Sequence, residues 1–303
     1  MLATYESLFG EKPRQVTSPL EKGDHPELDT SELLGPKDVR IYQSLIGAAQ
    51  WAISLGRFDV TTAVMTLSSF RASPRKGHLD RMKRVYGFFA KLRHATIRYR
   101  TDEPDLSDVE YFDHDWSNTP YRGAKETLPT DAPPPLGKPV RMTTYADSNL
   151  GHDFMTGKAV TGVLHFLNKT PYDWYSKKQA TVETATYGAE CSAARTAIEQ
   201  IRANKLLLLY LGVPVRDEAY LFGDNKSVVD GTTRPQGTLH KRHHMLSYHF
   251  VREAIASGAI RFAHVPGAKN PADILSKHWG YQCVWKLLQP ILFHRGDTMT
   301  LQQ

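Results

Sequence analysis

The apolar residues of this chain follow two different spacings, and a proline-rich stretch separates them. Between residues 37 and 100 they recur every three to four positions, as in Tyr42, Leu45 and Ile46, which predicts packed helices. From about residue 140 onward, short strand-like runs alternate with longer helical patterns. The chain therefore combines a small, mainly helical region with an α/β region.

Residues 101–139 separate the two patterns. They hold acidic runs and the triple proline Pro133–Pro135, which favour a linker. We expect a helical domain at 1–100, the linker at 101–139, an α/β domain at 140–280 and a C-terminal tail at 281–303. The linker composition buries little apolar surface, so the two halves are predicted to form separate cores.

The pattern in the α/β domain, residues 140–280, predicts one mixed, five-stranded sheet flanked by helices. The expected strands are Met142–Asp147, Val160–Asn168, Tyr172–Tyr175, Ala219–Phe222 and Ile260–Val265. The expected helices are Thr184–Tyr210, a short one after Asn225, Lys241–Ser257 and Asn270–Trp279. A further short strand is expected in the first half, at 95–99.

Charge and cysteine content narrow the function classes. The net charge is +6, and all of the positive excess lies in residues 140–303, which hold 19 basic and 13 acidic residues. Such a surface attracts polyanions or is simply solvated. The two cysteines, Cys191 and Cys283, exclude a disulfide framework and a cysteine-based zinc site. No membrane span or signal peptide is visible, so we expect a cytoplasmic or nuclear protein.

Four acidic residues occupy positions at which this layout could gather them. Asp147 and Asp224 end strands, Glu190 lies in the first long helix, and Asp273 opens the last one. A single acid at a strand end is usually a turn or cap residue. Four converging carboxylates need a cation, and hard oxygen ligands select Mg²⁺ or Mn²⁺.

The segments around these acids resemble one family. They are Thr144–Asn149, Val160–Gly162, Asp173–Gln179, Thr181–Glu190, Gly223–Ser227, His249–Glu253, His264–Gly267 and Pro271–Lys277. In this order, over about 140 residues, they resemble the ribonuclease H domain of copia-type LTR retrotransposon polyproteins.

This resemblance implies a ribonuclease H-like fold and hydrolysis of the RNA strand of RNA/DNA hybrids with two Mg²⁺ ions, which Mn²⁺ can replace. It also implies that Asp147, Glu190, Asp224 and Asp273 are the catalytic and metal-binding residues. The expected location is the cytoplasm, including virus-like particles, or the nucleus.

Residues 35–100 are similar to the thumb and connection that follow a reverse-transcriptase palm. The similarity lies in Ile41–Gly47, Gly56–Val60, His78 and Lys83–Arg84. The adjacent aspartates of a palm are absent from the sequence, so no polymerase activity is expected of this chain. The upstream palm of a longer polyprotein is an expected partner.

Basic residues near the predicted site suggest contacts with nucleic acid. The candidates are Lys177, Lys178, Lys241, Arg242 and Arg252. A histidine cluster nearby, formed by His240, His243, His244 and His249, has a spacing that could bind zinc. The interleaved Lys241 and Arg242 favour instead a basic face that touches phosphates or is solvated.

Two other functions remain to be weighed. One is a catalytically silent retroelement remnant that packs against a polymerase or binds hybrid without cutting it. The other is an integrase or transposase on the same fold. Those enzymes place the glutamate last among three acids, whereas here Glu190 comes second, with spacings of 43, 34 and 49 residues between the four acids. The order disfavours the integrase.

Overall fold

Five strands form the mixed sheet that the sequence predicts. The computed structural model describes residues 1–239, 244–279 and 286–294, and its sheet has the order β4-β3-β2-β5-β6. The strands are β2 Met142–Asn149, β3 Val160–Leu167, β4 Thr170–Lys178, β5 Ala219–Gly223 and β6 Ile260–His264. Strands β2, β3 and β4 are antiparallel, whereas β5 pairs parallel with both β2 and β6. The predicted fold class is confirmed.

The third strand is longer than predicted. It runs from Thr170 to Lys178, because β3 and β4 form a tight hairpin in which pairing starts at Leu167 and Thr170. Asn168, with a φ of 54°, makes the left-handed turn between them. The extra pairing carries Lys177 and Lys178 to the same end of the sheet as Val160 and Thr161.

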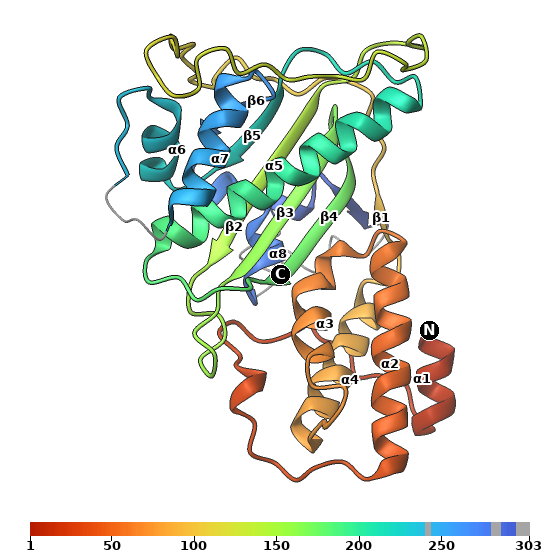
Figure 1. Cartoon of the computed structure of the whole chain (residues 1–303). Coiled ribbons are helices and arrows are strands. Elements are labelled where there is room, and N and C mark those ends of the chain that lie inside the picture. The colour runs from red at the N-terminus through yellow and green to blue at the C-terminus, as the bar shows by residue number, and fades with distance from the viewer. Residues whose placement is uncertain (240–243, 280–285, 295–303) are drawn as a thin grey trace.

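Three helices cover one face of the sheet (Figure 1). They are α5 Thr186–Tyr210, α6 Lys226–Thr233 and α7 Met245–Ala256. Ala194, Ile198 and Ile201 recur at helical spacing along α5 and are buried in one cluster with Ala146 of β2 and Leu221 of β5. This packing fixes α5 across the middle of the sheet.

The opposite face is covered by the short helix α8 Asp273–Ser276 and by the N-terminal helical region. That region holds α1 Leu2–Phe9, α2 Pro36–Ser54, α3 Thr61–Ser68 and α4 Lys76–Lys91, with short 3-10 helices η1 Pro26–Leu28 and η2 Phe58–Val60. The ring of Phe58 lies 5.3 Å from that of Trp174 on β4, and Thr62 donates a hydrogen bond to the Ile274 carbonyl at 2.9 Å.

The prediction of two separate cores is therefore wrong. A single buried cluster contains Tyr42 and Phe88 of the helical region together with Leu164 of β3 and Leu275 of α8. The apolar spacing of α3 shows that it buries a face, but it does not show which element that face contacts. In the fold, α3 packs on β4 and α8.

Residues 101–139, which we call the strap, hold no helix or strand, but they pack against the α/β region. They run along one border of the α/β region (Figure 1). Glu126 pairs with the buried Lys205 of α5, and Trp116 lies against the guanidinium of Arg252 at 4.9 Å. Some of the acidic residues that predict a linker, such as Asp102, Glu103 and Glu126, form ion pairs here.

Three details complete the comparison with the expected elements. The short strand β1 Ala95–Ile97 pairs antiparallel with β7 Leu292–His294, which lies in the segment predicted as a tail. The rest of 281–303 lies largely outside the described residues, and the domain boundaries stay a prediction. The last helix spans only Asp273–Ser276, because Lys277 is already extended. No helix in the described ranges has the length and apolarity to span a membrane.

Candidate active site and metal centre

Three carboxylates meet at one end of the sheet. Asp147 lies near the end of β2, and Asp224 directly follows the neighbouring parallel strand β5. Glu190 reaches the same place from the second turn of α5. One carboxylate oxygen from each of the three lies within 4.8 Å of those of the other two. The predicted convergence of these three side chains is confirmed, and we call them the acidic cluster.

The fourth predicted acid, Asp273, lies beside the cluster at the start of α8. A single ammonium group joins it to Asp147, because Lys277 Nζ lies 2.6 Å from Asp273 Oδ1 and 3.3 Å from Asp147 Oδ2. Asp147 is fully buried, and Asp273 is half-buried. All four acids therefore share one end of the sheet, although Asp273 stands outside the tightest group.

Close packing of α8 on the sheet brings Asp273 there. Gly162 is the residue of β3 that pairs with Asp147, and α8 lies directly over it. A Cβ atom at residue 162 would lie 2.7 Å from the Ala272 carbonyl oxygen and 2.8 Å from the Leu275 carbonyl carbon. Only a glycine permits this approach.

A buried asparagine secures the loop before α8. Asn270 donates to the Ala146 carbonyl at 3.0 Å, and its own side-chain oxygen accepts from the Ala272 N–H at 3.1 Å. The loop that carries Asp273 is thus tied to the residue preceding Asp147.

Burial and mutual repulsion shift the pKa values of this group. Burial, together with the nearby Asp147 and Asp224 carboxylates, raises the pKa of Glu190 to about 9. Burial and Asp147 also raise the pKa of Asp224, and the same two causes raise the pKa of Asp273 to about 6. Without a divalent cation this group must hold protons at neutral pH.

The donor set fits a hard divalent cation. All three ligand atoms of the acidic cluster are carboxylate oxygens, the type that Mg²⁺ and Mn²⁺ prefer, and their shared repulsion supplies the electrostatic reason to bind one. The ion would be held by Asp147, Glu190 and Asp224.

Two residues that contact Asp147 were not singled out in the sequence. Ser276 donates a hydrogen bond to Asp147 Oδ2, and Lys277 contacts both Asp147 and Asp273. Their signal in the sequence was their place in the Pro271–Lys277 segment, where Lys277 lies four residues after Asp273. Helical spacing alone would not show that the side chains of Ser276 and Lys277 both point toward β2.

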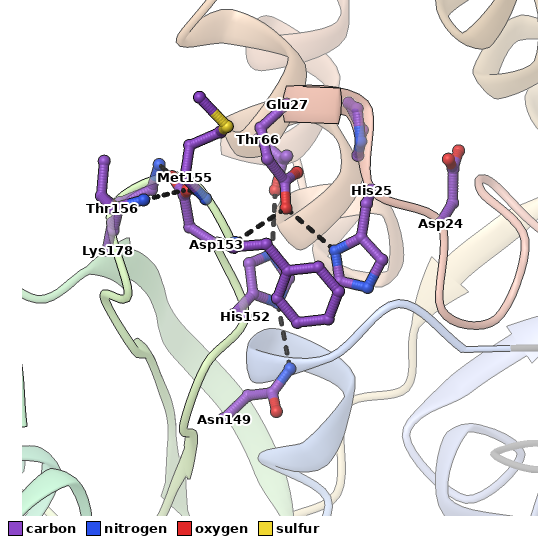
Figure 2. A network of polar contacts seen from close by, with 12 residues as sticks. Asp24, His25, Glu27, Thr66, Asn149, His152, Asp153, Met155, Thr156 and Lys178 are labelled. Atoms are coloured by element: carbon purple, nitrogen blue, oxygen red, sulfur yellow. Dashed lines mark hydrogen bonds and ion pairs between the residues drawn. The ribbon is translucent and has the colours of Figure 1, made fainter. Parts of the chain in front are cut away.

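The loop that follows β2 is anchored to the helical region (Figure 2). His152 lies between Asn149, at 3.0 Å, and Thr66 of α3, at 3.5 Å. Glu27 accepts a hydrogen bond from the Phe154 N–H at 3.0 Å. The helical region thereby supports the end of β2 that carries Asp147.

The predicted nucleic-acid contacts are only partly available. Lys177 is exposed, whereas the Lys178 ammonium is paired with the buried Asp153 (Figure 2). Both line a groove of about 710 Å³ between β4 and α5, together with Lys158 and Arg195. Gln179 connects this groove to the cluster, because its side chain donates to the carbonyl of Ala189, next to Glu190. Lys241 and Arg242 lie outside the described residues.

The predicted phosphate contact of Arg252 is wrong. Its side chain is buried, with 4% exposed, and its guanidinium donates to the carbonyls of Gly231, Arg234 and Pro235 at 2.7–3.1 Å. A basic residue on a predicted helix looks the same in sequence whether it faces solvent or neighbouring carbonyls. In this fold Arg252 ties α7 to the last turn of α6 and to the residues after it.

The zinc hypothesis gains no support from the described histidines. His244 pairs with Glu183 at 3.1 Å, and His249 contacts Tyr121 of the strap. His240 and His243 lie outside the described residues. The acidic cluster is the one group of potential metal ligands found in the part of the chain that the structure describes.

The topology defines a ribonuclease H-like fold. The antiparallel strands β2, β3 and β4 are followed by β5 and β6, which run parallel to β2, and carboxylates lie at the ends of β2 and β5. The chain carries the acids of a candidate metal-dependent hydrolase on this fold.

Its homologues are retrovirus-related Pol polyproteins of transposons. The chain is 25% identical over 264 residues, 87% of its length, to the Pol polyprotein from transposon RE1 of Arabidopsis thaliana. It is 22% identical over 78% of its length to that of transposon TNT 1-94 of Nicotiana tabacum. The chain spans about 15% of the length of each of these two polyproteins. No family model matches it.

Solved structures with a similar fold include ribonucleases H. RNase H1 from Halobacterium salinarum NRC-1 is 18% identical, with a TM-score of 0.35, and the match covers 45% of this chain and 94% of that one. LC11-RNase H1, solved in complex with an RNA/DNA hybrid, is 19% identical, with a TM-score of 0.36 and the same two coverages.

Proposed function

We propose that this chain is a metal-dependent ribonuclease H that hydrolyses the RNA strand of RNA/DNA hybrids. The observation that carries the proposal is the acidic cluster, in which Asp147, Glu190 and Asp224 converge within 4.8 Å on a ribonuclease H-like sheet. Buried carboxylates that repel one another in this way are stabilised by a divalent cation.

Each acid is given a role in this proposal. Asp147, Glu190 and Asp224 would hold one ion on the side of the attacking water, and Asp147 would also help to hold a second ion. Asp273 would hold the second ion. When bound, Mg²⁺ or Mn²⁺ would lower the pKa of a water molecule and offset the charge that develops on the phosphate.

The substrate side of the proposal rests on the basic groove. Lys158, Lys177 and Arg195 line it, and phosphate contacts carry little base information. We therefore expect weak sequence preference. Discrimination of RNA from DNA requires contacts to 2′-hydroxyl groups, and a comparison of hybrid with the two homoduplexes measures it.

The test is cleavage of a labelled RNA/DNA hybrid by the purified chain in Mg²⁺, in Mn²⁺ and in EDTA. Asp147→Asn keeps the size of the side chain but removes the charge that holds the ions. We expect it to lower the cleavage rate by at least two to three decades, which corresponds to about 3–4 kcal/mol in the barrier. Hybrid binding in Ca²⁺ should stay within a few-fold.

Asp80→Asn is the matched control, because Asp80 is an exposed acid on α4 that undergoes the same chemical change. It should cleave at the parent rate. If the folded parent chain binds hybrid but cuts nothing in either metal, the alternative of a silent, hybrid-binding remnant replaces the nuclease.

The same reasoning extends to location and assembly. We propose that the chain works in the cytoplasm or nucleus beside the palm of a longer polyprotein. The small share of its relatives' length that it spans supports the palm as a partner and does not bear on the location. Co-purification of the chain with a separately expressed palm from such a polyprotein would test it.

A further inference from the structure

The ammonium group of Lys277 occupies one side of the candidate metal centre. Its Nζ atom lies 2.6 Å from Asp273 Oδ1, 3.3 Å from Asp147 Oδ2 and 3.5 Å from Asp147 Oδ1. Among the ion pairs of the described residues, those of Lys277 are the ones that involve the four acids. A positive charge therefore already stands where Asp147 and Asp273 face each other.

We propose that Lys277 is the resident counter-ion of Asp147 and Asp273, and that it weakens the binding of a second divalent ion on that side of the cluster. This inference rests on the proposed metal-dependent function. It assigns different properties to the two sides of Asp147. One side, toward Glu190 and Asp224, has no basic partner among the described ion pairs, and the other already holds one positive charge.

The position of Lys277 is fixed from the backbone. It directly follows α8, four residues after Asp273, and its extended conformation ends that helix. The preceding Ser276 is fully buried and donates to Asp147 Oδ2. Adjacent residues thus hold the same carboxylate, one by a neutral hydrogen bond and one by charge.

A divalent ion and this ammonium group cannot share the space between the two carboxylates. Mg²⁺ binds carboxylate oxygens at about 2.0–2.1 Å, which would place it within the present contact distance of Nζ. The two cations would also repel each other strongly at that separation. The Lys277 side chain is 39% exposed, so it has solvent into which it can turn when an ion displaces it.

The arrangement predicts sequential metal binding. Asp147, Glu190 and Asp224 would hold the first ion. Asp147 and Asp273 would hold a second ion only when Lys277 gives up its contacts with them. The first site should therefore be tight, and the second weak.

Mn²⁺ titration of the full chain, followed by calorimetry and by electron paramagnetic resonance of free Mn²⁺, tests this inference without an activity measurement. We expect the parent to bind one ion tightly and a second weakly. Lys277→Met should bind the second ion at least ten-fold more tightly, and the gain at the first site should be smaller. Lys277→Arg, which keeps the charge, should resemble the parent.

Lys205→Met is the matched control, because Lys205 is also an ion-paired lysine but lies in the later part of α5 and contacts Glu126. It should leave both Mn²⁺ affinities unchanged. If Lys277→Met folds poorly, Lys277→Gln replaces it, and thermal unfolding gives a second readout. Either variant should melt below the parent in EDTA and gain more than the parent from Mn²⁺.

Identical isotherms for the parent and Lys277→Met, or an equal gain in melting temperature from Mn²⁺, would overturn the counter-ion proposal. Hybrid cleavage separates this failure from failure of the proposed function. If the chain cleaves hybrid and the isotherms are unchanged, only the counter-ion proposal fails. If the isotherms shift and no hybrid is cleaved, only the proposed nuclease function fails.

Discussion

Replacing Gly162 with alanine is expected to destabilise the chain and to impair cleavage, although residue 162 carries no functional side chain. In the fold, β3 supports α8 at this point, and α8 positions Asp273, Ser276 and Lys277. The single added methyl group would meet the backbone of α8 rather than a flexible side chain.

The size of the effect follows from three distances. The added Cβ atom would lie 2.7 Å from the Ala272 oxygen, 2.8 Å from the Leu275 carbonyl carbon and 2.9 Å from Leu275 Cβ, whereas ordinary contacts begin at 3.4 Å. Helix α8 would have to move by about 0.5–0.7 Å. Overpacking of this kind costs about 1–3 kcal/mol, and the lower chain entropy of alanine in the unfolded state offsets about 0.4–1 kcal/mol of it.

The assay is urea denaturation together with hybrid cleavage in Mg²⁺. We expect a net loss of about 1–2 kcal/mol in the free energy of unfolding. The cleavage rate should fall by about one to two decades, because small displacements of a positioned group are costly in catalysis. The Mn²⁺ affinity of the first site should change little, since its three ligands lie on β2, α5 and the end of β5.

Gly47→Ala is the matched control. Gly47 is exposed in the middle of α2, and a Cβ atom there would meet nothing within 4 Å. This variant should be more stable by about 0.4–1 kcal/mol and should cleave at the parent rate. If Gly162→Ala unfolds at the parent midpoint and cleaves normally, the claim that α8 requires a glycine beneath it is refuted.

Three further predictions concern charge. The metal-free chain should lose stability as the pH rises from about 4.5 to 9, because folded Glu190, with its pKa raised to about 9, keeps a proton that the unfolded chain releases. Urea denaturation in EDTA at pH 5, 7 and 9 measures this. A free energy of unfolding that rises with pH would contradict it. Saturating Mg²⁺ should flatten that profile, since the ion replaces the proton. Arg252→Gln should cost about 1–3 kcal/mol in urea denaturation by leaving buried carbonyls without donors, and an unchanged midpoint would count against the structural role. Lys177→Gln should instead leave the stability unchanged and weaken hybrid binding. It should also lower the slope of the logarithm of the binding constant against the logarithm of the salt concentration by about 1. A slope equal to that of the parent would exclude a phosphate contact.

The sequence alone predicted the five strands and placed Asp147, Glu190 and Asp224 where they can meet. These features are local, because alternation marks a strand and the residue after a parallel strand lies at its carboxyl end. The resemblance of the segments around the acids pointed to the same residues. Convergence then follows from pairing β2 with β5 in parallel, which places residues 147 and 224 at the same end of the sheet.

Only the tertiary structure decided which distant elements touch. The apolar spacing of α3 is the same whether it packs on other helices or on β4, and the acidic strap has the composition of a free linker until Glu126 meets Lys205. Likewise, nothing in the local pattern distinguishes Arg252, buried against carbonyls, from Lys177, exposed beside the groove. Periodicity reports that a face is buried or that a charge is present, but the partner depends on contacts between residues far apart in the chain.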